Sequence, residues 1–446
     1  MQECLERVLK RVRAAGAEGD VVALEGVSTT VRVRLGEVDL VSQSRDRGLG
    51  VRVFVGERSA VASTSDLSAE SLESLVDATL GRASSTAAVA HAGLPEPALM
   101  GEADAPLALA DGGGESITVD AAIQMAKDAE SAALGVDPRL TQSSGAEMSW
   151  GTSTRTLGST TGFMGSYVGT LHALGVTPVA EVDGELTRDS WSSVRRHAGD
   201  LASPAEVGRV AGERAIARVG ASTPGTCRVP VVFDPRTAGR LASALASALN
   251  GYSVQRGQSF LQGRIGERVA ASGFHLYDDP CLPRGLGSRP FDGEGLPSRR
   301  NSLIEDGVVQ GYLLDTFIGR KLGQPSTHSA SRGIAGAPTV ATSNLCIAPG
   351  EASPEEIIGS VRDGLYVTEL FGFGVNPTTG DISQGAAGLW IRDGKLDHGV
   401  QEITIAGELV SLFKSLEAIG NDPHPESTIR TPTLKFAEMT VGGAGG

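Results

Sequence analysis

The sequence predicts an α+β protein of two domains: an N-terminal domain of helices on an antiparallel sheet and a strand-rich C-terminal domain. The chain of 446 residues exceeds one ordinary domain, so two domains of roughly 200 residues each are expected. The first half shows the order helix, strands, helix. The second half repeatedly places Asp-Gly between apolar runs, a strong hairpin signal. We place the boundary at Ser222 to Gly225, which gives domains 1–222 and 223–446.

The N-terminal domain is expected to begin with an amphipathic helix. Leu5, Val8, Leu9 and Val12 share one face of this helix. Ser68 is a good N-cap for a second helix, in which apolar residues again recur at helical spacing. Between the two helices we expect strands separated by glycine turns, over residues 21–24, 29–35, 37–44 and 48–55.

Residues 83–115 are rich in Ala, Pro and Gly and show no period, so we expect a partly mobile connection. Beyond it, Val119 to Leu134 is expected to form an amphipathic helix, and residues 144–182 a meander of short strands. An Asp-Gly turn at Asp183 and a helix over residues 203–219 complete the predicted domain.

The C-terminal domain opens with a strand, residues 228–233, that leads into the most clearly marked helix of the chain. Asp234 is the expected N-cap, and Pro235 suits the first helical position because its missing N–H costs nothing there. Asn250-Gly251 predicts a left-handed stop. Further along, Asp306-Gly307 and Asp393-Gly394 predict hairpins, and Ser353-Pro354 begins a short helix.

Composition limits the function and the compartment. The net charge of −14 argues against a broad nucleic-acid footprint and against binding to an anionic membrane surface. No stretch reaches the ~20 apolar residues that a membrane span needs, and the charged amino terminus does not resemble a signal peptide. The four cysteines lie far apart without metal-binding spacing, so reduced thiols in the cytoplasm are expected.

Several stretches resemble one known family. The segment from Asp234 through Arg256-Gly257-Gln258-Ser259 to Gly266-Glu267 resembles the TldD/PmbA family, often labelled modulators of DNA gyrase, whose active TldD-type members are zinc peptidases. The runs GEVDLVSQSRDRGLGVRVFVGERSAVASTSDLS, LFGFGVNPTTGDISQGAAGLW and TPTLKFAEMTVGG extend the resemblance over nearly the whole chain. The latter two resemble the PmbA/TldE branch, which lacks the motif HExxxH.

The zinc motif of the active relatives is missing from this sequence. When the motif is aligned without a gap from Arg256-Gly257, its first His falls on Ala242, its Glu on Ser243 and its second His on Ser247. We therefore expect no metal and a regular helix in this chain. In the active relatives a Cys near the carboxy terminus completes the zinc site, but residues 424–433 contain no Cys.

Other kinds of catalytic site have little support in the sequence. A metal site with substituted ligands could involve His275, Asp278, Asp279 and Cys281, but their spacing has no helix to align it, so we favour a loop with solvated carboxylates. No G-x-S-x-G motif supports a serine nucleophile. The glycine runs at 372–374 and 385–388 lack the context of a phosphate loop and predict turns and close backbone contacts.

A group of polar residues on a glycine-punctuated strand and turn could bind an extended peptide by strand addition. An internal hairpin or a subunit contact is the alternative, which we favour. The candidate peptide-binding residues are Asn376, Thr379, Asp381, Ser383 and Gln384.

The resemblance implies a PmbA/TldE-like subunit without a cofactor of its own. It would pair with a TldD-like subunit that holds the zinc, and the heterodimer would degrade or mature unfolded or modified peptides. The alternatives are a self-contained hydrolase with an unrecognised site and a homodimeric peptide-binding protein. Any link to gyrase is expected to be indirect, because nothing basic in the sequence follows a phosphate backbone.

Overall fold

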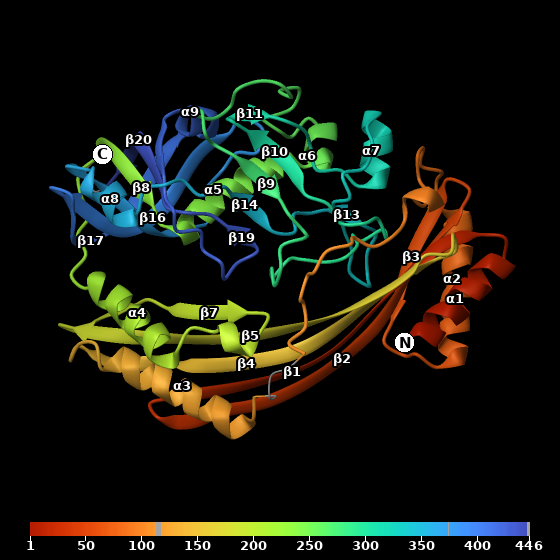
Figure 1. Cartoon of the computed structure of the whole chain (residues 1–446), viewed down its shortest axis with the longest axis horizontal. Coiled ribbons are helices and arrows are strands. Elements are labelled where there is room, and N and C mark those ends of the chain that lie inside the picture. Colours follow the sequence, from red (N-terminus) through yellow and green to blue (C-terminus); the bar gives the residue numbers. More distant parts are fainter. Residues whose placement is uncertain (113–116, 373, 444–446) are drawn as a thin grey trace.

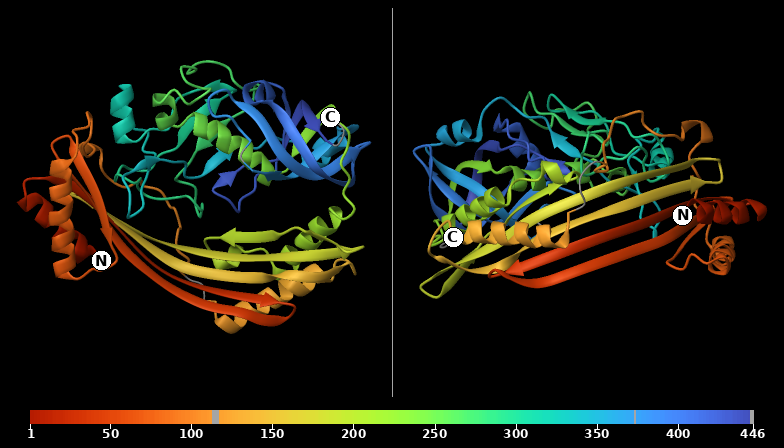
Figure 2. Two further views of the ribbon diagram at one scale, coloured as in Figure 1. Left: turned by 180° about the vertical axis from the view of Figure 1, so that it is seen from behind. Right: turned by 60° about the horizontal axis from the view of Figure 1, so that its bottom comes forward.

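Figure 1 shows the computed structural model of the chain, which describes residues 1–112, 117–372 and 374–443. A long, curved sheet forms one layer, and the C-terminal half of the chain lies across its concave side (Figures 1 and 2). Both halves contain helices and antiparallel strands, so the predicted α+β class is confirmed. The division into domains 1–222 and 223–446 remains a prediction.

The long sheet belongs to the N-terminal half and is antiparallel throughout. Its strand order is β3-β2-β1-β4-β5-β6, and β7 also pairs with β5. The strands are β1 (Glu18–Arg34), β2 (Glu37–Val55), β3 (Arg58–Thr64), β4 (Leu140–Ser159), β5 (Met164–Val182), β6 (Glu185–Arg188) and β7 (Trp191–Arg195).

The strands of this sheet are longer than predicted. Residues 21–24 and 29–35 lie in the single strand β1, although Leu35 itself falls in the turn that follows, and residues 37–44 and 48–55 lie in β2. The predicted short strands of residues 144–182 are likewise the two long strands β4 and β5, whose meander with β6 is confirmed.

Glycines within these strands serve close packing and do not break the pairing. Gly26 pairs with Asp46 on one side and Ser153 on the other in continuous register. A Cβ atom on Gly50 would lie only 1.9 Å from the carbonyl oxygen of Ile334. Glycine is therefore needed where the C-terminal half touches the sheet.

Two helix pairs cover one face of the sheet, which we call the outer face. Val21 packs beneath α1 (Gln2–Ala14) and α2 (Ala69–Ser85), and Val31 packs beneath α3 (Val119–Leu134) and α4 (Pro204–Ala217). Because Val21 and Val31 are an even number of residues apart in β1, they point to the same face. The inner face turns toward the C-terminal half (Figure 1). No helix in the described ranges is long and apolar enough to cross a membrane.

The C-terminal half contains two larger sheets and a two-stranded one. The first has the order β17-β16-β15-β8-β20-β18, the second β11-β10-β9-β14-β19, and β12 pairs with β13. The strands are β8 (Cys227–Phe233), β9 (Leu276–Asp278), β10 (Asn301–Glu305), β11 (Val308–Val309), β12 (Ala330–Ser331), β13 (Thr339–Val340), β14 (Leu345–Ile347), β15 (Asp363–Phe371), β16 (Asp381–Arg392), β17 (Lys395–Glu408), β18 (Leu416–Ile419), β19 (Ile429–Arg430) and β20 (Leu434–Gly442).

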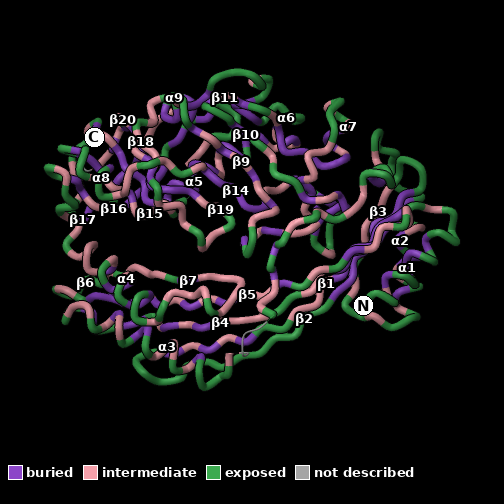
Figure 3. The backbone as a smooth tube through the Cα atoms, viewed as in Figure 1, coloured by how far each residue is buried: buried purple, intermediate pink, exposed green. Residues whose placement is uncertain are grey.

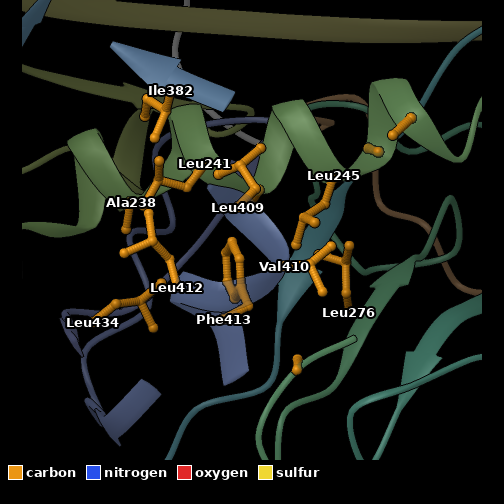
Figure 4. Close-up of a cluster of buried hydrophobic side chains, with 14 of the residues drawn as sticks. Ala238, Leu241, Leu245, Leu276, Ile382, Leu409, Val410, Leu412, Phe413 and Leu434 are labelled. Atoms are coloured by element: carbon orange, nitrogen blue, oxygen red, sulfur yellow. The ribbon is translucent and has the colours of Figure 1, made fainter. Parts of the chain in front are cut away.

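Helix α5 (Pro235–Ala248) lies at the centre of the largest core and packs against strands of both larger sheets. Leu241 and Leu245 lie on the side of α5 nearest to Phe413 (Figure 4). The ring of Phe413 meets that of Phe436 edge to face, at 5.5 Å between centroids. Figure 3 shows this core as the most continuous buried region of the C-terminal half. The remaining helices are α6 (Gly251–Gln255), α7 (Thr316–Leu322), α8 (Pro354–Gly359), α9 (Leu409–Lys414), η1 (Pro97–Leu99) and η2 (Ala198–Asp200).

The start of α5 is as predicted, but its end is not. Asp234 caps the helix by accepting a hydrogen bond of 2.7 Å from the amide of Thr237. The predicted left-handed stop at Asn250-Gly251 is wrong, because Asn250 instead caps α6 by accepting a hydrogen bond from the amide of Tyr252. Gly251 allows a close approach of Leu314, because a Cβ atom at this position would lie 2.5 Å from a Leu314 methyl carbon.

The Asp-Gly turns are confirmed. Asp306 and Gly307 have φ angles of 47° and 76°, as a type I′ turn requires, and they join β10 to β11. Asp393 and Gly394 join β16 to β17 in the same way, with φ angles of 48° and 77°.

Part of the predicted connection 83–115 is tied to both halves of the chain. Its first residues complete α2, which ends at Ser85. Further on, the amide of Ala103 donates to the carbonyl of Pro290, and the amide of Thr170 donates to the carbonyl of Leu109. Residues 113–115 of the connection lie outside the described residues.

Candidate functional site

The three positions of the lost zinc motif lie on α5 but offer no metal ligand. Ala242 is buried in the core, and Ser243 donates its hydroxyl to the carbonyl of Gly239 at 2.8 Å. Ser247 is exposed. Zinc prefers imidazole, thiolate or carboxylate ligands, so these side chains do not fit the ion that the resemblance implies. The helix is α-helical from Pro235 to Ala248, so the predicted regular helix is confirmed.

The C-terminal loop that would supply the third ligand does lie over α5. Thr431 donates its hydroxyl to the carbonyl of Pro235 at 2.6 Å, which fixes this loop against the first turn of the helix. Cys346 lies on the adjacent strand β14 and is paired with Arg430 of β19. Burial raises the pKa of the Cys346 thiol to about 11, so the thiol stays protonated at neutral pH.

The carboxylates of the alternative cluster around His275 are engaged in other contacts. Its central residues form strand β9 and not a loop, and Asp278 is buried, so the expectation of a loop with solvated carboxylates is wrong there. Asp278 accepts hydrogen bonds from the amide and hydroxyl of Ser343, and Asp279 accepts one from the amide of Cys281. Over the described ranges no group of three or more His, Cys, Asp or Glu side chains is arranged to hold a metal ion.

The candidate peptide-binding residues lie together on one hairpin, at the start of β16. Asn376, Thr379, Asp381 and Ser383 are exposed, whereas Gln384 is buried and donates to the carbonyl of Gly372. The amide of Ser383 donates to the carbonyl of Gly374, and β17 pairs along the other edge of β16. Both edges of the strand are therefore occupied at this point. Phe373 lies outside the described residues.

An aromatic and cationic cluster near the start of α5 was not predicted from the sequence. The ring of Trp191 in β7 lies 5.3 Å from the guanidinium carbon of Arg236 and 5.4 Å from that of Arg214. The ring of His424 lies 5.8 Å from Trp191. Burial, together with Arg236, Arg195 and Arg214, lowers the pKa of His424 to about 4, so the imidazole is neutral at pH 7. The cluster joins the long sheet to the loop over α5.

A groove between the inner face of the long sheet and the loop at residues 286–289 was also missed. It encloses a cavity of about 670 Å³. Its basic lining residues come from β2, β4, the segment after β7 and this loop, namely Arg47, Arg155, Arg196 and Arg289. Residues so far apart in the sequence form no local pattern, so nothing in the sequence could have revealed the groove.

Comparison with known protein families accounts for almost the whole chain. Residues 19–92 match PmbA/TldA metallopeptidase domain 1, residues 113–219 match the central domain, and residues 226–443 match the C-terminal domain.

Two bacterial relatives are similar along nearly their full length. The chain is 32% identical to a metalloprotease PmbA homolog of Haemophilus influenzae, over 99% of this chain and 96% of the relative. It is 34% identical to metalloprotease PmbA of Escherichia coli O157:H7, over 97% of this chain and 93% of the relative.

Solved structures show the same fold. A crystal structure of a proposed modulator of DNA gyrase from Bacteroides thetaiotaomicron matches with a TM-score of 0.91 and 28% identity, over 99% of this chain and 98% of that one. TldE from Thermococcus kodakarensis matches with a TM-score of 0.85 at 22% identity, over 99% of this chain and 100% of that one. The matches of all three family domains and the full-length relatives lead to one conclusion: the chain belongs to the PmbA/TldD metallopeptidase family.

Proposed function

We propose that this chain is the PmbA/TldE-like subunit of a cytoplasmic two-subunit metallopeptidase and holds no catalytic metal of its own. The observation that carries the proposal is the chemistry of α5, where Ala242, Ser243 and Ser247 stand at the positions of the zinc motif. A TldD-like partner would supply the zinc, which activates water for attack on a peptide bond. The substrates would be unfolded or modified peptides.

The contribution of this chain is then to shape the space in which the partner works. Between the long sheet and the C-terminal half lies a groove with a cavity of about 670 Å³, a size that suits an extended peptide better than a folded protein. The exposed side chains of Asn376, Thr379 and Asp381 are candidates to contact the peptide. Because the main chain of β16 is already paired at Ser383, these contacts would come from side chains and not from strand addition.

The test is to measure metal content and peptidase activity for the pure chain, for a TldD-like chain from the same genome and for their mixture. An unstructured peptide serves as substrate. We expect no stoichiometric zinc in the pure chain, and cleavage only, or much faster, in the mixture. A variant of the partner with its motif Glu replaced by Gln should abolish activity of the mixture.

Two results would overturn the proposal. Zinc binding and cleavage by the pure chain would indicate a self-contained hydrolase. Stable self-association with peptide binding, and no effect on the partner's activity, would indicate a homodimeric binding protein.

A further inference from the structure

The groove between the long sheet and the loop at 286–289 is open to solvent and continues into a second cavity. The cavity of about 670 Å³ adjoins a second one of about 350 Å³, and Gly169 and Arg196 line both. The floor is the inner face of β1, β4 and β5, where glycine leaves the backbone uncovered at Gly26 and Gly151. Asp46 and Ser153 at the rim are exposed, so the groove is accessible from solvent.

The arginines of the groove are not held in direct ion pairs. None of the four forms an ion pair within 4.0 Å in the described parts of the chain. Arg196 donates to the carbonyls of Thr170, Gly285 and Leu286, and Arg155 donates to the carbonyl of Arg332. Such carbonyls satisfy the N–H groups but carry no full negative charge, and Asp292 acts on Arg155 without a direct ion pair. Burial accordingly lowers the pKa of Arg155 and of Arg196 from their usual value.

Arg289 offers an unused donor in the same groove. Its Nε atom is buried and has no hydrogen-bond partner among the described residues. Two buried carboxylates, Asp278 and Asp292, lie close enough for Arg289 to lower their pKa. Their oxygens are nevertheless occupied by other donors, namely Ser343 at Asp278 and the amides of residues 294, 296 and 330 at Asp292.

The charge balance of the groove is opposite to that of the chain. Four arginines line the larger cavity against two carboxylates, Glu25 and Asp46, whereas the chain as a whole carries −14. Glycine at position 169 makes room for one of these arginines, because a Cβ atom there would lie 2.7 Å from Nη1 of Arg196.

We propose that this groove binds the carboxylates of an extended acidic peptide segment. Guanidinium groups recognise carboxylates through charge-assisted hydrogen bonds, and the two adjoining cavities with their bare sheet floor suit an extended chain. The choice of a peptide as ligand rests on the proposed function, whereas the presence of an anion site rests on the arginines of the groove alone.

The test measures binding of two fluorescently labelled peptides to the full chain by polarisation. One is a short glutamate-rich peptide, and the other has glutamine in place of each glutamate. We expect the glutamate peptide to bind at least about tenfold tighter, and this preference to shrink when salt is raised from roughly 0.05 to 0.5 M.

Variants locate the binding. Arg289→Gln should weaken binding of the glutamate peptide about tenfold. Arg47→Gln should weaken it about threefold, as suits an exposed charge; it makes no side-chain hydrogen bond or ion pair in the described ranges, so folding is not at risk. Arg82→Gln is the matched control, because Arg82 is exposed on α2, outside the cavity, and should change nothing.

Three outcomes would overturn the inference: equal binding of both peptides, an equal loss with Arg82→Gln, or no binding of either peptide. Cleavage by the two-subunit mixture separates this inference from the proposed function. If the mixture cleaves both peptides equally well while the pure chain binds neither, only the groove assignment fails. If the charge preference in binding holds but the mixture is inactive, only the subunit role fails.

Discussion

Asp278 is a carboxylate that the fold keeps away from water. It is 1% exposed, and the amide and hydroxyl of Ser343 donate to it at 2.7 and 2.9 Å. Burial raises its pKa to about 6, against the opposing effect of these hydrogen bonds. The folded state therefore holds a proton at Asp278 up to a higher pH than the unfolded state does.

This shift predicts a loss of stability as pH rises. The unfolded chain releases the proton near pH 4 and the folded chain near pH 6, so the free energy of unfolding falls by about 3 kcal/mol across that interval, at 1.36 kcal/mol per pKa unit. Asp278→Asn removes the ionisation. Urea unfolding at several pH values should show that the free energy of unfolding of the variant rises relative to that of the natural chain, by up to this amount, between about pH 4 and pH 6.

Asp137 provides a control of opposite sign. It pairs with Arg139 at 2.9 Å, and the hydrogen bonds from Arg139 lower its pKa to about 2. Ionised Asp137 thus stabilises the fold above the pKa of the unfolded chain, and this contribution is lost as pH falls. The free energy of unfolding of Asp137→Asn should therefore fall relative to that of the natural chain as pH rises. If the Asp278 variant showed the same trend, the assignment of its pKa shift would be wrong.

At the scale of elements, glycine sets the distance between α3 and α4. A Cβ atom on Gly208 of α4 would lie 2.3 Å from the carbonyl oxygen of Ala129 in α3 and 2.7 Å from the Cβ atom of Ala132. The surface of α3 is also small at this contact, because the residues nearest to Gly208 are Ala129, Ala132 and Ala133. The two helices can approach closely only because both surfaces are small.

Gly208→Ala should therefore destabilise the chain by about 1–3 kcal/mol, the usual cost of overpacking, although alanine is the better helix former. Gly81→Ala is the matched control, because Gly81 lies in α2 with nothing within 4 Å of its Cβ position. It should stabilise the chain by up to about 1 kcal/mol. Thermal unfolding of both variants tests the contrast, and two shifts of the same sign would contradict it.

The elements also show how far sequence patterns reach. The caps and apolar stripe at Asp234 fixed the start of α5, and Asp-Gly pairs fixed the hairpins, because these signals are local. The predicted break in β2 between residues 44 and 48 is wrong, because Gly48 and Gly50 serve contact with the distant Ile334 and do not mark a turn. The end of α5 was missed because Asn250 can cap a following helix as well as stop the preceding one.

Some features of the candidate site follow from local sequence, and others depend on segments that are distant in the sequence. Missing ligands at Ala242, Ser243 and Ser247 could be read from the sequence, because a motif has fixed spacing. The groove arginines could not, because they meet only when the loop at 286–289 lies against the sheet. The burial of Asp278 was likewise invisible, since its partner Ser343 comes from a distant segment.

At the scale of the whole molecule, a buried charge network joins the long sheet to the C-terminal half. Asp20 of β1 pairs with Arg52 of β2 and with Arg332, and all three are at most 7% exposed. Glu294 lies 3.8 Å from Arg52. Although burial opposes ionisation, Arg332 and Arg52 hold the pKa of Asp20 below its usual value. The apolar contact of Val22 with Phe291 lies on the same inner face.

Asp20→Asn tests whether this network holds the halves together. The substitution keeps the shape of the side chain but leaves Arg332 buried without an ion pair among the described residues and Arg52 with Glu294 alone, which should cost about 3–5 kcal/mol. Glu73→Gln, which breaks an exposed pair with Arg7, should cost less than about 1 kcal/mol. Urea unfolding should show a lower midpoint for the Asp20 variant.

Two tryptophans report on the two halves of the chain, namely Trp150 in the sheet and Trp390 in β16. Fluorescence of single-tryptophan variants should show the two halves unfolding together in the natural chain and separately after Asp20→Asn. A cost as small as that of Glu73→Gln would show that apolar contacts such as Val22 with Phe291, and not the ion pairs, hold the C-terminal half against the sheet.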